Sequence, residues 1–109
     1  MVVVPREHFP ALADLDSGTG ARIFNVAQRM AAGLRESGLR CEGVNLFYAD
    51  GEAAFQEVFH AHLHVFPRFD GDGFGLVANW DTPPSRSELE TVGEQIRNGL
   101  ETVLTRGSR

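Results

Sequence analysis

Apolar residues recur along the chain with two different periods, and these periods predict its first strand and first helix. The β-branched run at 2–4 predicts a short strand, and residues 6–18 are expected to form a loop with at most one helical turn around 10–14. Over 20–36, apolar side chains recur every three or four positions, which predicts an amphipathic helix that ends before Gly38. Its expected buried face comprises Ile23, Val26, Ala27, Met30, Ala31 and Leu34.

The second half of the chain predicts two more strands and a second helix. Residues 43–49 and 57–68 have the aromatic and β-branched composition of strands. Residues 76–80 are interpreted as either an edge strand or a packed tail. Two serines, each followed three positions later by a glutamate, fit capping-box spacing and predict a helix from about residue 86. Its expected buried stripe comprises Leu89, Val92, Ile96, Leu100 and Val103.

These elements predict an α+β fold, in which a small antiparallel sheet has two main helices packed on it. The length of 109 residues fits a single domain spanning 1–109. With 42% hydrophobic and 23% charged residues, the composition is that of a globular chain rather than a disordered or fibrous one. The chain is therefore expected to bury one core between its sheet and helices.

The charge and the apolar runs argue against two classes of partner. A formal net charge of -5, without a cluster of Lys and Arg, argues against binding to a nucleic-acid polymer. No apolar run approaches the roughly 20 residues that cross a bilayer, so no membrane partner is expected. The single cysteine, Cys41, cannot close an intrachain disulfide, and this favours the reducing cytoplasm.

Three of the four histidines occupy alternate positions in the segment FHAHLHVFPRF, namely His60, His62 and His64. The residues that follow each of them are apolar, namely Ala61, Leu63 and Val65. Because successive side chains of a strand point to opposite faces, the imidazoles should share one face while their apolar neighbours enter the core. Such a row of imidazoles is suited to a small charged ligand.

Two kinds of chemistry use a row of this type. Neutral imidazoles bind Zn, Fe or Cu, but the site normally adds another His, Cys or carboxylate, and the candidates Cys41, Asp70 and Asp72 lie outside the strand. No metal or cofactor is therefore expected, and a metal-dependent enzyme is kept as an alternative. The other use is attack by an imidazole nitrogen on phosphorus, which requires a fixed acceptor for the second ring nitrogen. Neighbouring imidazoles would then donate to the phosphate oxygens.

The segment QEVFHAHLHVFPR, residues 56–68, resembles the signature of the histidine triad (HIT) superfamily. The similarity extends to GVNLFYADGEAAFQ upstream, to PRFDGDGFG downstream and to VVVPREH near the start, and so covers nearly the whole chain. This resemblance implies an enzyme that hydrolyses or transfers a nucleoside monophosphate. The implied substrates are diadenosine polyphosphates, nucleoside phosphoramidates or aminoacyl adenylates, and the implied partner is a small purine mononucleotide or dinucleotide. Dimers are usual in that family, so a homodimer is expected.

The resemblance also implies roles for individual residues. His62 would attack the α-phosphate and form a nucleotidyl-histidine. His60 would hold His62 in the required tautomer through its backbone carbonyl, and His64 would donate a hydrogen bond to the phosphate. Gln56 would lie near the phosphate or the leaving group, and Asn45 is a weaker candidate for substrate binding.

Two features depart from the family pattern. Family members usually carry a small residue, often Gly, directly before the Gln, where this chain has Phe55. The family's domain also opens with strands that supply the nucleoside pocket and a ribose-binding carboxylate, followed by a Gly-His pair. Because this chain begins after that point, we expect a HIT-like fold lacking the first strands, and a true start upstream of Met1 is preferred to a natural short form. A catalytically impaired nucleotide-binding or interaction module is therefore a second hypothesis.

Three further residues have simpler interpretations. His8 is either a turn residue or a structural metal ligand, since some family members bind zinc with cysteines from their N-terminal part. The sequence has only Cys41, so the turn interpretation is preferred. Phe74 and Trp80 are expected to pack in the protein or at a dimer interface rather than to stack on a base.

Overall fold

The computed structural model describes residues 1–79 and 81–107. Its strands are β1 (Val2–Val3), β2 (Gly43–Phe47) and β3 (Leu63–Arg68), and its helices are α1 (Ser17–Glu36) and α2 (Arg86–Gly107). The chain divides into two compact units, Met1–Phe74 and Gly75–Arg109, each with its own architecture. A single domain over residues 1–109 therefore stays a prediction.

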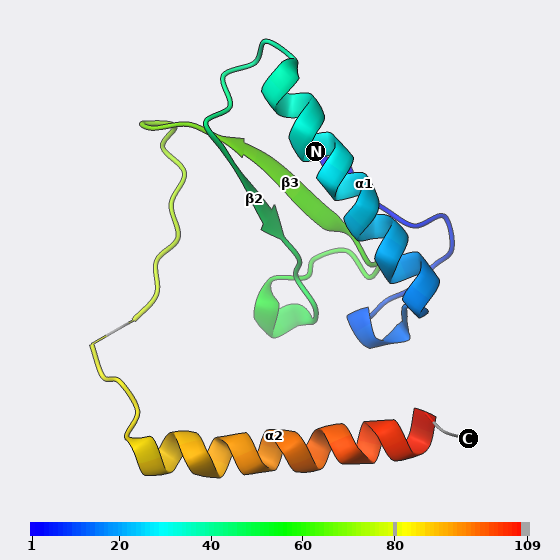
Figure 1. Ribbon diagram of the computed structural model, residues 1–109, viewed down its shortest axis with the longest axis vertical. Coiled ribbons are helices and arrows are strands. Elements are labelled where there is room, and N and C mark those ends of the chain that lie inside the picture. Colours follow the sequence, from blue (N-terminus) through cyan, green and yellow to red (C-terminus); the bar gives the residue numbers. More distant parts are fainter. Residues whose placement is uncertain (80, 108–109) are drawn as a thin grey trace. The chain divides into compact units, whose positions relative to one another are not determined.

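The first unit is a three-stranded antiparallel sheet with α1 on one face (Figure 1). The strand order is β1-β3-β2, so β3 is central and pairs on both sides. His64 on β3 lies opposite Val2 of β1 and opposite Phe47 of β2. The sheet and the two helices confirm the predicted α+β class, and the register places one of the predicted site histidines in the middle of the sheet.

The core lies between α1 and the sheet. Its buried members are Val3, Ile23, Ala27, Leu34, Leu63 and Val65. On α1 the buried positions follow the spacing of residues 23, 27 and 34, with Met30 packed against them, as expected for one helical face. Val26 was also expected there, but it is 41% exposed, because Ala27 occupies the contact with the sheet. The helix ends at Glu36, and Gly38 follows with a φ of 84°, a conformation that favours glycine.

Two strand predictions differ from the structure. The strand predicted over 57–68 begins only at Leu63, because β1 offers just two residues for pairing before Pro5, which has no N–H to donate. The strand predicted over 43–49 ends at Phe47. Within 76–79 there is no strand, and Val77 is fully exposed within its own unit, so the edge strand is not observed there and the packed tail stays a prediction. The short helical turn expected near 10–14 is present as a 3-10 turn at Leu12–Asp14.

The second unit contains α2. The helix starts at Arg86 as predicted, and the Ser85 hydroxyl accepts a hydrogen bond from the backbone N–H of Glu88 at 3.2 Å. The predicted buried stripe is exposed instead, with values of 49% at Val92 and 62% at Val103. Packing of α2 on the sheet therefore stays a prediction, and the expectation for Trp80 lies outside the described residues. No helix in the described part of the chain is both long and apolar enough to span a membrane.

Candidate active site

The histidine segment alternates as the sequence predicts. The three apolar residues of the row are almost fully buried, with exposures of 1% at Ala61, 8% at Leu63 and 0% at Val65. The three histidines are half-buried and lie on the other side of the backbone. Burial of the apolar residues under α1 thus fixes the backbone that carries the imidazoles, because side chains alternate along an extended segment.

The His62 ring is held by a single short hydrogen bond. Its Nδ1 lies 2.6 Å from the backbone carbonyl oxygen of His60. A carbonyl oxygen only accepts, so Nδ1 carries the proton and donates it. In the neutral ring the lone pair is therefore on Nε2, for which no hydrogen-bond partner exists within residues 1–79 and 81–107. The structure leaves one nucleophilic nitrogen available at this position.

His64 lies directly beside that ring. The centroids of the His62 and His64 rings are 4.9 Å apart, and the rings are nearly perpendicular, at 80°. The pKa of His64 is lowered from 6.5, mainly because burial disfavours the charged ring and further because His62 and the N-terminal ammonium repel it. At neutral pH, His64 is thus an uncharged imidazole able to donate one N–H toward a ligand bound at His62.

The His60 side chain lies in a different environment from the other two. Its Nε2 is 3.1 Å from the carbonyl oxygen of Pro5, and its Nδ1 is 3.1 Å from Nδ1 of His8. The His8 and His60 rings are stacked, with centroids 5.2 Å apart. Since Nε2 of neutral His60 must donate to Pro5, its Nδ1 accepts a hydrogen bond from His8. His8 is 52 positions from His60 in the sequence, so no local pattern predicts this contact.

The side chain of Gln56 forms hydrogen bonds with backbone groups. Its side chain is 6% exposed, and Oε1 accepts a hydrogen bond from the N–H of Gly51 at 2.7 Å. Its Nε2 donates to the carbonyl oxygens of Pro10 and Val58, at 2.8 and 3.2 Å. These bonds tie the loop before the histidines to the loop after β1. The role of Gln56 at a phosphate stays a prediction.

Asn45 also has a partner within the protein. Its Oδ1 accepts a hydrogen bond from Nη1 of Arg68 at 2.6 Å, and its Cα partner across the ladder is Phe66. Asn45 therefore lies two positions away from the pair of Phe47 and His64, toward the end of β3. Its predicted part in substrate binding likewise stays a prediction.

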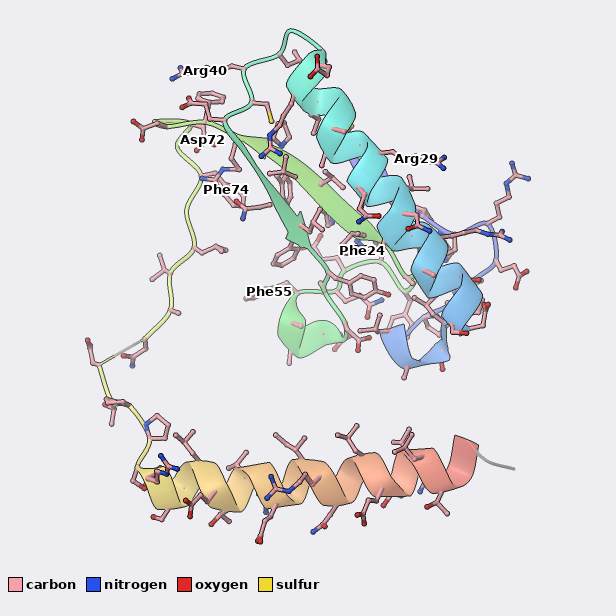
Figure 2. The ribbon with its side chains drawn as sticks, viewed as in Figure 1. Phe24, Arg29, Arg40, Phe55, Asp72 and Phe74 are labelled. Atoms are coloured by element: carbon pink, nitrogen blue, oxygen red, sulfur yellow. The ribbon has the colours of Figure 1, made fainter. Side chains whose placement is uncertain are left out.

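Phe55, directly before Gln56, has a backbone conformation that favours glycine. Its φ is 73°, and its side chain is 78% exposed and projects outward (Figure 2). A left-handed conformation costs a residue with a Cβ about 1–2 kcal/mol, which exceeds the roughly 0.5–1 kcal/mol of extra chain entropy that glycine loses. This conformation gives a physical reason for a glycine at the same place in similar sequences.

We predict that Phe55→Gly raises the free energy of unfolding by roughly 0.5–1 kcal/mol in urea denaturation. Ala54→Gly, one residue earlier at a position without a positive φ, is the matched control and should lower the stability by a similar amount. Equal destabilisation by both variants would contradict a strained Phe55 backbone.

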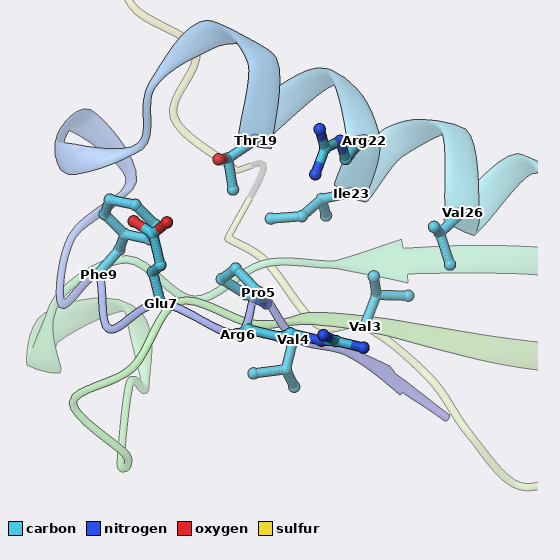
Figure 3. A pocket seen from close by; sticks show the side chains of 10 residues that line it. All are labelled: Val3, Val4, Pro5, Arg6, Glu7, Phe9, Thr19, Arg22, Ile23 and Val26. Carbon is cyan, nitrogen blue, oxygen red and sulfur yellow. The ribbon is translucent and has the colours of Figure 1, made fainter.

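A separate cavity lies on the α1 side of β1. It measures about 320 Å³ and is bounded by β1, the loop that follows and the first half of α1 (Figure 3). Val3 and Ile23 form part of its walls, and Arg6 and Arg22 line it as well. None of the three row histidines lines this cavity. It is therefore not the site of the His62 and His64 imidazoles.

The chain is similar to curated proteins and to solved structures. It is 39% identical over 76 residues to an uncharacterized HIT-like protein of Borreliella burgdorferi, covering 69% of this chain and 55% of that protein. It is 26% identical over 100 residues to the adenosine 5'-monophosphoramidase hnt1 of Schizosaccharomyces pombe, covering 91% and 71%. A Zn-bound histidine triad family protein from Mycobacterium smegmatis matches in structure with a TM-score of 0.63 and 39% identity, covering 95% and 70%.

The zinc of that relative raises the question of a metal in this chain. The Nδ1 atoms of His8 and His60 lie 3.1 Å apart. Within the described residues, however, no group of three or more His, Cys, Asp or Glu side chains is placed to hold a metal ion. Zinc in proteins normally has three or four protein ligands. The residues described therefore do not form a complete zinc site.

The family itself follows from the extent of these matches. The HIT domain model matches residues 1–71, which is more than half of the chain and includes β1, α1, β2, β3 and the whole histidine segment. The chain spans about half the length of the Borreliella relative and about two thirds of others, such as Protein hit of Bacillus subtilis, to which it is 33% identical. By sequence and by fold, the chain belongs to the histidine triad (HIT) family.

Proposed function

We propose that this chain is a nucleotide hydrolase or nucleotidyl transferase that cleaves at the α-phosphate of a nucleoside phosphoramidate or phosphoanhydride, including dinucleoside polyphosphates. The observation that carries the proposal is the 2.6 Å hydrogen bond from His62 Nδ1 to the His60 carbonyl oxygen, since in the neutral ring it places the lone pair on Nε2. Kinship with the phosphoramidase of Schizosaccharomyces pombe supports the choice of substrate class.

The reaction has two displacement steps at phosphorus. In the first, Nε2 of His62 forms a bond to the α-phosphorus, the bond from phosphorus to the leaving group breaks, and the leaving group takes up a proton. In the second, water attacks the same phosphorus, its proton is lost, and His62 is released with a nucleoside monophosphate as product. An acceptor other than water in the second step makes the reaction a transfer.

The neighbours of His62 have supporting roles in this proposal. The backbone carbonyl of His60 keeps the tautomer of His62 fixed through both steps. His64, 4.9 Å away between ring centroids, donates its N–H to a non-bridging phosphate oxygen, whose charge grows in the transition state. Neither step requires a metal or another cofactor. Gln56 is proposed to act near the phosphate or the leaving group, and Asn45 is the weaker candidate for substrate binding. We further expect a homodimer in the cytoplasm.

The direct test is incubation of the purified chain with adenosine phosphoramidate and chromatographic detection of AMP. We predict turnover that survives treatment with a chelator. Calorimetry with AMP and GMP is the companion measurement. Binding of either nucleotide without turnover would favour the impaired binding module, and turnover abolished by the chelator would favour a metal-dependent enzyme. Either result would contradict the proposal.

A further inference from the structure

A row of stacked rings continues from His64 toward the end of β3. The His64 and Phe66 rings are parallel within 4°, with centroids 5.5 Å apart. The Phe66 ring is followed by that of Phe74, with centroids 5.3 Å apart and planes 36° apart. Arg68 follows Phe66 by two residues on β3, and its guanidinium lies over the Phe74 ring. Phe74 therefore contacts Phe66 on the side opposite to His64. The imidazole thus forms one end of a three-ring stack.

The far end of this stack is closed by an ion pair. The Arg68 guanidinium lies 4.5 Å from the Phe74 ring centroid, and its Nη2 donates to the Phe74 carbonyl oxygen at 2.7 Å. Asp72 accepts from Nε and Nη2 of Arg68 at 2.7 and 3.2 Å, a two-pronged geometry that fixes both planes. Asp72 also accepts from the N–H of Phe74 at 3.1 Å. Figure 2 shows Asp72 and Phe74 in the loop that follows β3.

The ion pair is well formed for a site near the surface. The side chains of Arg68 and Asp72 are only 25% and 11% exposed. The hydrogen bonds from Arg68 hold the pKa of Asp72 well below its usual range, so the pair stays charged throughout the physiological range. A charge-assisted, two-pronged contact of this kind orders the loop from residue 69 to 74.

The stack is better suited to positioning than to binding a base. The Phe66 ring has His64 on one side and Phe74 on the other, so its faces are already in contact with the protein. The Arg68 guanidinium is engaged with Asp72, Asn45 and the Phe74 carbonyl, so it is not an uncommitted cation for a phosphate. What this arrangement can do is hold the His64 ring in one orientation and keep water from one of its faces.

We propose that Phe66, Phe74 and the Arg68–Asp72 ion pair form a brace that positions the His64 imidazole for the reaction at His62. The effect of the brace on the reaction rests on the proposed function, whereas its effect on the orientation of the His64 ring does not. The members of the brace are positioning residues, because none of them is assigned a contact with the substrate. Its link to chemistry is His64 alone.

Three groups outside the brace also lie near His64. His62 lies beside it on the same segment, and the N-terminal ammonium of Met1 is near through its contact with the Val65 carbonyl at 3.3 Å. From β2, the neighbour is Phe47, whose ring centroid is 6.2 Å away and which carries no charge. Changes at Phe74 leave all three of these groups in place. Any response of His64 to such a change therefore comes through the brace itself, either through the Phe66 ring or through the Arg68–Asp72 pair that lies against Phe74.

The test is Phe74→Leu in the full chain, with two measurements. The first follows the His64 ring protons by NMR during a pH titration, and the second determines kcat and KM on adenosine phosphoramidate. We expect the His64 pKa to rise, because water reaches the ring and stabilises its charged form. We expect kcat to fall on the order of 10-fold while KM changes by less than about 2-fold, because only the transition-state contact is loosened.

Phe69→Leu is the matched control. Phe69 lies in the same loop and has a guanidinium against its ring in the same way, with Arg40 at 4.5 Å from the ring centroid, but among the described residues no ring contact joins Phe69 to the stack. The Phe69→Leu substitution should leave the His64 titration and kcat unchanged. Phe66→Leu is the second variant, used if Phe74→Leu does not fold, and should shift both readouts in the same direction because it removes the ring between Phe74 and His64 without changing any charge.

Each outcome bears on the brace. A shift of the His64 titration in Phe74→Leu or Phe66→Leu, absent in Phe69→Leu, supports it. An unchanged titration in the folded variants, or an equal shift in the control, overturns it. If the parent chain has no turnover and the titration still shifts, the brace stands and the proposed function fails. If turnover is present and neither readout responds, the brace fails alone.

Discussion

Replacing His62 by Asn is expected to reduce turnover of adenosine phosphoramidate on the order of 10⁴-fold or more, as loss of a covalent nucleophile does in other enzymes. The reason is local. His62 Nε2 is the ring nitrogen left unprotonated by the 2.6 Å bond to the His60 carbonyl, and an amide in its place has no comparable nucleophile. The measurement is kcat from AMP release under saturating substrate, with circular dichroism to show that the variant is folded.

His8→Asn provides the matched control for this change. His8 contacts the His60 side chain, whereas the group that orients His62 is the His60 backbone carbonyl. The control should therefore lose far less activity than His62→Asn. Undiminished turnover in His62→Asn would assign the nucleophile to another residue, and equal losses in both variants would point to a general disturbance of the segment.

His64→Ala is expected to have the second-largest effect, a loss of roughly 10²–10³-fold in kcat, which corresponds to about 2.7–4 kcal/mol of barrier. That magnitude is the measured cost of removing one donor from an oxyanion-binding site in another enzyme. His64 is uncharged at neutral pH, since burial lowers its pKa, so its hydrogen bond joins a neutral N–H donor to a charged phosphate oxygen.

The kinetic signature separates this role from a structural one. If His64 contacts phosphate oxygens mainly in the transition state, kcat should fall while KM stays within a few-fold, and His64→Gln, which keeps an N–H donor, should recover part of the loss. A rise in KM with kcat unchanged would assign His64 to ground-state binding. No effect of the Ala variant would remove it from the site.

Periodicity predicted most of the first unit, because its elements bury one face each. Residues 23, 27 and 34 of α1 and residues 61, 63 and 65 of the histidine segment are buried at the spacings expected for a helix and an extended chain. The late start of β3 was not predictable from its own composition. Strand formation also needs a partner, and β1 pairs only Val2 and Val3 with it.

Dependence on partners elsewhere in the chain also explains which features of the site the sequence did not predict. Alternation gave the shared face of the histidines but not the direction of the His60 ring, which depends on Pro5 and His8, more than 50 positions away. Gln56 is predicted near the phosphate or the leaving group, and its three bonds to backbone groups, which use both of its N–H donors, were not foreseen. Long-range contacts of this kind leave no periodic trace in a sequence.

The α2 stripe shows the corresponding limit for a helix. Its spacing correctly predicted a helix with one apolar face, starting at Arg86. An amphipathic pattern indicates that a face favours burial but does not identify its partner. Within the second unit those side chains are about half-exposed or more, for example Ile96 at 59%.

The central claim is that His62 becomes covalently bonded to the substrate's α-phosphorus. It is tested most directly by mixing the chain with excess adenosine phosphoramidate, quenching within milliseconds in alkaline denaturant, in which a phosphorus–nitrogen bond to histidine survives, and mapping the peptides by mass spectrometry. The account predicts an added adenylyl group on His62 in the parent chain and its absence in His62→Asn. An adduct on another residue, or turnover without any adduct under these conditions, would contradict it.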